Sequence, residues 1–510
     1  RDDPMSVRLS LLALLACCAP LPLAAAPSNS LAPNSLALAN RLSWGETAQS
    51  DTLHGQSVQA WLEQQLHPSA DDGLPPPVQA QIDAMEISRK NISQLNDEVR
   101  ELRRQAQRDK GDTDARKAYR QKLNQLMREA QTRSLLRDLY SRNQLKEQLT
   151  WFWFNHFNVH AQKGEIRAFV GDYEDTIRAH ALGKFRDLLL ATAVHPAMLQ
   201  YLDNAQNAAS HINENYAREI MELHTLGVGS GYSQQDVQEL ARVLTGLGLN
   251  LSGRLPGGDR RGDFRHDFAD ETGNVSLTLF NADRHDFGEK HFLGTSIRGR
   301  GIDEIGTAIV ILAAEPPTAH FVSRQLAQYF CCDAPSDRLV NAMAATWRRS
   351  DGDIAEVLKT LFASPELAAS LGDKFKDPIH YAVSAVRASY GDKVVVNAQP
   401  LLNWLNRMGE PLFGHETPDG YSLTAGGWSG PGEMATRFEI AQQIGGGARN
   451  LFKPDDAPPM PAPPPVLQQT AYYTALTPAL SRATTDAIAK GQSQGDRNML
   501  FLSSPEFMRR

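Results

Sequence analysis

One short stretch near the middle of the chain gathers side chains suited to acid–base chemistry. Glu214, Glu219 and Glu222 stand there with Arg218 and His224, within about three turns of a helix. Two carboxylates kept close in a partly dry cleft acquire different pKa values, so one stays protonated as an acid and the other is ionised as a base. Hydrolysis of glycosidic bonds uses such a pair. Glu219 and Glu222 are therefore the catalytic candidates; the alternative is that ion pairs with Arg218 fix the helix packing.

The spacing of apolar residues predicts a helix for this stretch and a second helix after a glycine turn. Tyr216, Ile220 and Leu223 recur at intervals of four and three, which gives one apolar face. Asn213 precedes them as an N-cap. Three closely spaced glycines then allow a tight reversal. Ser233, with an aspartate three positions on, opens the next helix in the manner of a capping box.

A histidine and an aspartate, His285 and Asp286, follow an irregular segment at 248–281. Residues 275–280 alternate like a strand, so the segment is a long loop or a short hairpin. Loops of this length are uncommon unless they have a function. We therefore expect it to deliver His285 and Asp286 over the glutamate helix as catalytic groups or ligands. The alternative is that the pair caps the following helix.

The most aromatic stretch of the chain, 149–157, is expected to lie in the central core, and it surrounds Asn155 and His156. His156 and His160 are one turn apart, which is a metal-ligand spacing, but Phe157 replaces the glutamate of zincins. A histidine in an apolar helix is more commonly satisfied by a hydrogen bond. The cofactor is therefore unassigned. A divalent metal ion remains an option, with His156, His224 and His285 as candidate ligands.

Further polar and aromatic residues are candidates for holding a substrate. Trp428 on a glycine loop and Tyr201 at the end of a short helix could form a stacking platform for a sugar, although a loop anchor is the favoured interpretation of Trp428. The candidate substrate-binding residues are Asn155, His156, Tyr201, Asn213, Arg218 and Trp428.

Composition and motifs exclude several classes of protein. The chain has 510 residues, of which 41% are hydrophobic, enough for a substantial core. Its net charge of −7 disfavours nucleic-acid binding. There is no phosphate-binding loop, dinucleotide fingerprint, serine-hydrolase elbow or paired Cys-x-x-Cys motif. Helical periodicity without alternating strands predicts a mainly α fold, a large multi-helix domain with long inserted loops and at most a minor β-hairpin.

Changes in composition divide the chain into successive parts. These are a signal peptide at 1–26 with upstream residues 1–4, a linker at 27–38, a helical core at 39–450, a proline-rich loop at 451–469, and C-terminal helices at 470–510 that pack on the core. Within the core, 78–149 is highly charged, and Ile92, Leu95 and Val99 form a short heptad seam. We expect an antiparallel helical hairpin packed on the body rather than a coiled-coil partner site.

Two cysteines, Cys331 and Cys332, are adjacent at the end of a helical pattern. A disulfide between neighbouring residues is strained, because the usual Cα separation is hard to meet. We interpret them as buried apolar fillers.

An ordered series of segments resembles the bacterial DUF1800 family of uncharacterised proteins along nearly the whole chain. The segments are 61–66, 152–157, 185–189, 195–199, 201–204, 213–246, 285–290 and 504–507. The family has no established activity to transfer. The resemblance does imply one possible partner, because genes of this family commonly neighbour genes for sulfatase-like proteins of the DUF1501 family.

These observations favour an exported hydrolase that acts on a cell-envelope or extracellular polysaccharide by glycosidase-like carboxylate chemistry. The alternatives are a non-catalytic binding or scaffold partner of the sulfatase-like protein, and a metal-dependent hydrolase that uses the His/Glu/Asp cluster. If the site is catalytic, we expect its separated side chains to meet in one place. These are Asn155, His156, Arg218, Glu219, Glu222 and His285.

The N-terminal pattern predicts export to the periplasm or the medium. Arg8 precedes an apolar run at 9–23 and three alanines, the plan of a signal peptide. No later run is long and apolar enough to span a bilayer, so the mature chain is expected to have no transmembrane helix.

Intact-mass measurement on exported protein should show loss of everything before about Ala26. A mass that includes a lipid on Cys17, which follows a weak lipobox, would replace this prediction with a lipoprotein.

Overall fold

The computed structural model describes residues 33–108, 112–251, 277–391, 393–454, 458 and 463–510. The predicted mainly α fold is confirmed: these residues form twenty-three α-helices and two small antiparallel sheets. The signal peptide and Cys17 lie outside the described residues. Helix α1 (Pro33–Leu42) begins inside the predicted linker, because Leu36, Ala39 and Leu42 recur at helical spacing and are buried in the core.

Two helices that are enclosed on nearly all sides form the centre of the molecule. All residues of α7 (Gln144–His156) except Lys146 are buried, as are all residues of α18 (Pro378–Tyr390). The expectation that the aromatic stretch at 149–157 lies in the core is confirmed. Around α7 pack α1, α2 (Val58–Leu66), α6 (Thr113–Tyr140) and α8 (Val170–His180), and around α18 pack α6, α19 (Gln399–Arg407) and α20 (Pro431–Gly445).

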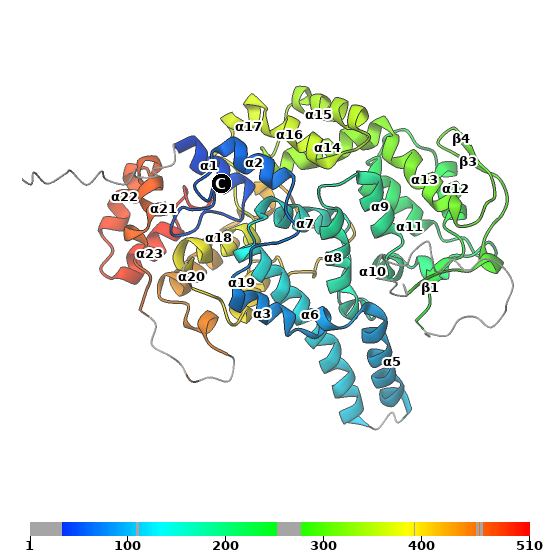
Figure 1. Cartoon of the computed structure of the whole chain (residues 1–510), viewed down its shortest axis with the longest axis horizontal. Helices are drawn as coiled ribbons and strands as arrows, with labels where there is room; N and C mark the ends of the chain where they lie inside the picture. The colour runs from blue at the N-terminus through cyan, green and yellow to red at the C-terminus, as the bar shows by residue number, and fades with distance from the viewer. Residues whose placement is uncertain (1–32, 109–111, 252–276, 392, 455–457, 459–462) are drawn as a thin grey trace, which may run out of the picture.

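The charged segment forms the predicted helical hairpin, made of α5 (Ile92–Arg108) and α6. Ile92, Leu95 and Val99 are buried along its seam. The C-terminal part of α6 packs on the body, whereas the other end of the hairpin extends away from it (Figure 1). The short helices α3 (Pro76–Asp83) and α4 (Glu86–Arg89) pack against α6.

A group of helices and both hairpins lies on the side of the molecule drawn in green in Figure 1. It contains α9 (Phe185–Ala193), α10 (Pro196–Tyr201), α11 (Glu214–Glu219), α12 (Gln234–Val243), α13 (Asp303–Ala314), β1 (Leu247–Leu249) paired with β2 (Thr278–Phe280), and β3 (Lys290–Phe292) paired with β4 (Thr295–Ile297). Of the strand predicted at 275–280, the described residues 277–280 contain β2; residues 252–276, most of the predicted loop at 248–281, lie outside the described residues. The β3–β4 hairpin escaped prediction, because its turn uses Leu293 at positive φ rather than the usual Asn or Asp.

The remaining helices cover the top and the C-terminal side of the body (Figure 1). They are α14 (Pro316–Phe330), α15 (Asp337–Ser350), α16 (Ile354–Phe362), α17 (Pro365–Ala369), α21 (Ala471–Leu476), α22 (Arg482–Ala489) and α23 (Gln494–Leu502). α23 packs on α20. In the described part of the chain, no single helix has the length and apolar character to cross a membrane. α13 and α14 meet those criteria only as a pair, and they bend by 67° at their junction.

The loop between α19 and α20 is fastened to the end of α7. The Asn155 amide donates to the Tyr421 carbonyl at 2.9 Å, and its oxygen accepts the Tyr421 N–H at 2.6 Å. Gly420 beside them has φ of +71°, and a Cβ there would lie 2.2 Å from the Asn155 carbonyl oxygen. Only glycine allows this close approach at a left-handed conformation.

Replacing Gly420 with alanine should therefore destabilise the protein. The left-handed conformation and the clash with backbone together should lower the free energy of unfolding by about 2 to 5 kcal/mol, measured by chemical denaturation. Gly432→Ala is the matched control, because a Cβ at Gly432, in the first turn of α20, meets nothing within 4 Å. Equal stability of the two variants would contradict the proposed constraint.

Candidate functional site

A cavity of about 1270 Å³ is bounded by the end of α7, by helices α14 and α15, by the segment that directly follows α11, and by the loop fastened by Asn155. Its wall is partly aromatic, with Phe152, Phe321 and Tyr421. The ionisable residues on the wall are His156, Glu222, His320, Arg324, Arg348 and Asp419. A large cavity with a few convergent polar groups is the default candidate for a binding site.

The predicted glutamate helix is present, but its second half is a π-helix. α11 continues directly into η3 (Ile220–Thr225), where the Thr225 hydroxyl donates to the Ile220 carbonyl at 2.7 Å. π-helical turns are rare and occur frequently at functional sites. In this turn Glu222 lies on the cavity wall, whereas His224 is buried.

Three carboxylates interact where this helix faces the loop. Partial burial of Glu219 raises its pKa above the ordinary value, and the nearby charges of Glu222 and Asp419 raise it further against the opposing effect of Arg218. Tyr232 is hydrogen-bonded to Glu222, and burial together with that carboxylate raises the tyrosine pKa to about 12. Burial and these charges thus favour the protonated form of Glu219, which is partly exposed and does not itself line the cavity.

Arg218 does not pair with Glu219, although an ion pair between them was the alternative role for that carboxylate. Its guanidinium is 3.3 Å from Glu214 and 3.4 Å from Glu222, and it donates to Gln234 at 2.8 Å. The Arg218 side chain is 37% exposed. Ion pairs this exposed contribute little to stability, so the carboxylates do not serve mainly to neutralise a buried cation.

His156 lines the cavity, but both of its ring nitrogens are engaged. Nε2 lies 3.0 Å from the His224 carbonyl oxygen, and Nδ1 lies 3.0 Å from the Gln325 side chain. Burial lowers the pKa of His156, so the neutral ring donates from Nε2 and accepts at Nδ1 once the Gln325 amide is turned to donate. This bonding connects α7 to η3 and α14 and leaves neither nitrogen for a metal ion.

The three candidate metal histidines do not form a ligand set. The ring centroids of His156 and His224 are 6.0 Å apart, and His285 lies in a separate hydrogen-bond network. His224 is buried with Nε2 unpaired, and burial holds its pKa well below the ordinary value. Over the part of the chain that the structure describes, the only group of three metal-ligand side chains with closely spaced ligand atoms excludes all three histidines.

The expectation that His285 and Asp286 reach the glutamate helix is not met, because their hydrogen-bond and ion-pair partners lie on α12, just after it and on α13; neither residue lines the cavity. His285 is buried, with Nδ1 2.7 Å from the Thr245 carbonyl and Nε2 3.1 Å from Glu304. Asp286 makes a two-point ion pair with Arg242, at 2.8 and 3.2 Å. These contacts join the β3–β4 hairpin to α12 and α13 and give both residues a structural role.

Three candidate substrate-binding residues have structural roles and lie off the cavity wall. The Tyr201 ring is buried and its hydroxyl donates to the Glu416 carbonyl at 2.8 Å. The Trp428 ring is buried too, and its N–H donates to the Ser422 carbonyl at 2.8 Å, so it anchors the loop rather than offering a free face. Asn213 is the N-cap of α11, as its position in the sequence indicated.

A basic wall escaped prediction. His320 and Arg324 of α14 and Arg348 of α15 line the cavity together with Gln328. Arg324 pairs with Asp337 at 2.6 Å, whereas Arg348 is exposed. The signal was present in the sequence: positions 320, 324 and 328 recur every four residues and give a predicted helix one polar stripe.

The comparisons with known proteins place the chain by family alone. Comparison with curated proteins and with solved structures gave no match. The model of the family described as "Protein of unknown function (DUF1800)" matches residues 37–509, nearly the whole chain. The region from α1 to the last helix thus follows one family pattern, and the chain belongs to the DUF1800 family of proteins of unknown function.

Proposed function

We propose that this protein is an exported hydrolase that cleaves glycosidic bonds of a cell-envelope or extracellular polysaccharide in the cavity beside η3. The observation that carries the proposal is Glu222 on the cavity wall, three positions after Glu219, whose pKa is raised by burial and by neighbouring carboxylates although Glu219 does not itself line the cavity. A pair of carboxyl groups with divergent proton affinities is what glycoside hydrolysis requires.

The two carboxyl groups have different tasks in this proposal. Protonated Glu219 gives its proton to the glycosidic oxygen as the bond to the leaving sugar breaks. The Glu222 carboxyl group, on the cavity wall, acts at the anomeric carbon, directly or through a water molecule. Asp419 on the facing loop adds negative charge that favours the protonated state of Glu219 before the reaction.

The part of the cavity wall formed by α14 and α15 suits a substrate with negative charge. His320, Arg324 and Arg348 line the cavity from these two helices, whereas Glu222 lines it from η3. A planar guanidinium can donate two parallel hydrogen bonds to a carboxylate or sulfate, which an ammonium group cannot. An acidic polysaccharide could therefore place its charged substituents on the basic wall and its scissile bond at the acidic wall.

Replacing Glu219 with glutamine should abolish release of reducing ends without lowering stability. Because the pKa of Glu219 is higher in the folded protein than its ordinary value of 4.5, ionisation of Glu219 opposes folding. The contribution of Glu219 to stability therefore falls as the pH rises from 4.5 through the pKa of the folded state. Glutamine removes this cost. We expect a melting temperature at neutral pH that is unchanged or slightly higher, with activity reduced by at least about 100-fold.

The assay panel is peptidoglycan, neutral polysaccharides and acidic polysaccharides, each with and without divalent metal ions. Glu214→Gln is the matched control, because Glu214 lies on the same helix and is partly exposed like Glu219, but it pairs with Arg218 and has no catalytic role in the proposal. Hydrolysis by wild type that survives in Glu219→Gln would contradict the assignment. Tight binding of a polysaccharide or of the sulfatase-like partner without any cleavage would support the binding role and overturn the hydrolase.

Reversing one charge on the basic wall should change substrate choice. Arg348→Glu is expected to raise KM for acidic polysaccharides by about 10-fold or more, because it replaces attraction with repulsion, and to leave kcat and the hydrolysis of neutral polymers nearly unchanged. Arg349→Glu is the control on the next position, which is exposed but off the cavity wall. Equal effects of the two substitutions in Michaelis–Menten measurements would refute a role for the basic wall.

A further inference from the structure

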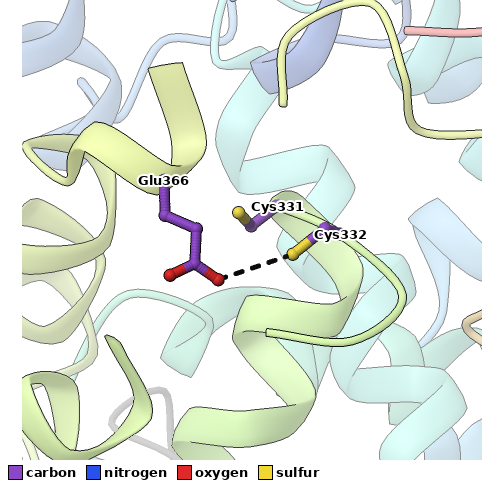
Figure 2. A group of neighbouring side chains, drawn as sticks. All are labelled: Cys331, Cys332 and Glu366. Atoms are coloured by element: carbon purple, nitrogen blue, oxygen red, sulfur yellow. Dashed lines mark hydrogen bonds between the residues drawn. The ribbon is translucent and has the colours of Figure 1, made fainter. Parts of the chain in front are cut away.

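A second cluster of reactive side chains lies where α14 ends. Cys331 and Cys332 follow the last residue of α14, and Glu366 reaches them from α17 (Figure 2). One sulfur from each cysteine and one carboxylate oxygen all lie within 4.8 Å of one another. Cys331 is buried and Cys332 is partly exposed, so the cluster is adjacent to solvent.

The backbone holds the three ligands in place before anything binds. The N–H groups of Cys331 and Cys332 both donate to the Ala327 carbonyl, at 2.8 and 3.3 Å. Glu366 accepts from the backbone N–H and the hydroxyl of Ser336, at 2.8 and 2.5 Å. A carboxylate has about four acceptor positions, so Glu366 keeps lone pairs for a further partner, and the Cys332 thiol points at one of its oxygens from 3.8 Å.

The two cysteines are free thiols rather than a disulfide. A bond between adjacent cysteines would strain the intervening peptide, and the Cys331 carbonyl of that peptide already accepts from Arg41 at 2.7 Å. The predicted role as apolar fillers fits Cys331 alone. It does not explain why Cys332 lies partly exposed with its sulfur 3.8 Å from a Glu366 carboxylate oxygen.

The surrounding charge suits an anionic metal complex. Two thiolates and a carboxylate carry three negative charges. A bound divalent cation would reduce the net charge of the site to −1. The Arg41 guanidinium lies against the Cys331 carbonyl, and the Lys374 ammonium pairs with Asp333, the residue after Cys332. These cations would offset the remaining negative charge.

We propose that Cys331, Cys332 and Glu366 form a zinc site. Zn²⁺ accepts thiolate and carboxylate ligands together at about 2.3 and 2.1 Å, and a small contraction of the cluster would meet those distances. The fourth position is open to water or to Ser370, whose hydroxyl oxygen is 3.6 Å from the Cys331 sulfur. The site is independent of the proposed hydrolase chemistry.

The zinc site lies next to the contacts that fasten the cavity loop. Asp333, which follows Cys332, accepts the Ala425 N–H at 2.8 Å and pairs with Lys374 at 2.5 Å. Lys374 in turn donates to the Leu423 carbonyl at 2.6 Å. Leu423 lines the cavity. Zinc would therefore stiffen the end of α14 and, through Asp333, one edge of the cavity.

The test measures zinc on the reduced, chelator-treated full chain by equilibrium dialysis and elemental analysis. We expect one zinc ion per chain for wild type. The affinity of Cys331→Ser/Cys332→Ser for zinc should be at least about 100-fold weaker, because losing a ligand should cost more than the roughly 10- to 100-fold lost when a group hydrogen-bonded to a ligand is removed. Glu366→Gln should weaken zinc binding while retaining an acceptor for Ser336. Cobalt(II) should give sulfur-to-metal absorption with wild type, and the double serine variant should lose it.

Two controls separate this site from other zinc binding. Cys17 and Cys18 remain in every variant, so their contribution cancels. His67→Ala removes an exposed His67–Glu63 pair and should leave the stoichiometry unchanged. Zinc should also raise the melting temperature of wild type and not of the double variant. Absence of zinc binding by the reduced wild type, or equal binding by the double variant, would overturn the proposal.

Discussion

The cavity depends on hydrogen bonds made at the end of α7. His156 donates to the His224 carbonyl of η3 and faces Gln325 of α14, while Asn155 exchanges two hydrogen bonds with Tyr421 of the loop. Each partner comes from a different wall of the cavity. Buried polar groups are costly unless they are paired, so these bonds fix the distance of each wall from α7 and hence the shape of the space between them.

The neutral state of His156 is part of the same constraint. Burial lowers the pKa of His156 against the opposing effect of its bonds to Gln325 and to the His224 carbonyl, and so favours the neutral ring. The ring is therefore a fixed connector rather than a ligand or a proton carrier. This leaves the acid–base candidates on the glutamate helix, where Glu219 has a raised pKa and Glu222 faces the cavity.

Sequence reasoning succeeded where the determining interactions are local. The caps at Asn213 and Ser233 depend on residues two or three positions away, and the hairpin seam of α5 depends on spacing alone; all are present. It failed for His285, because its partner Glu304 lies nineteen positions further on and nothing in the spacing shows that the two side chains meet. The basic wall was missed for a different reason: a polar stripe on a helix normally faces solvent, and only the packing of α14 against η3 turns it toward a cavity.

The loop between α19 and α20 is held at two separate points, and both involve α14 or its neighbours. Tyr421 is bonded to Asn155 of α7, which is adjacent to His156 and so to Gln325 of α14. Further along the loop, Leu423 and Ala425 are bonded to Lys374 and to Asp333, just beyond the end of α14. α14 thus carries His320 and Arg324 of the basic wall and, through the bonds at its end and at Gln325, helps to hold the loop that brings Asp419 to the cavity.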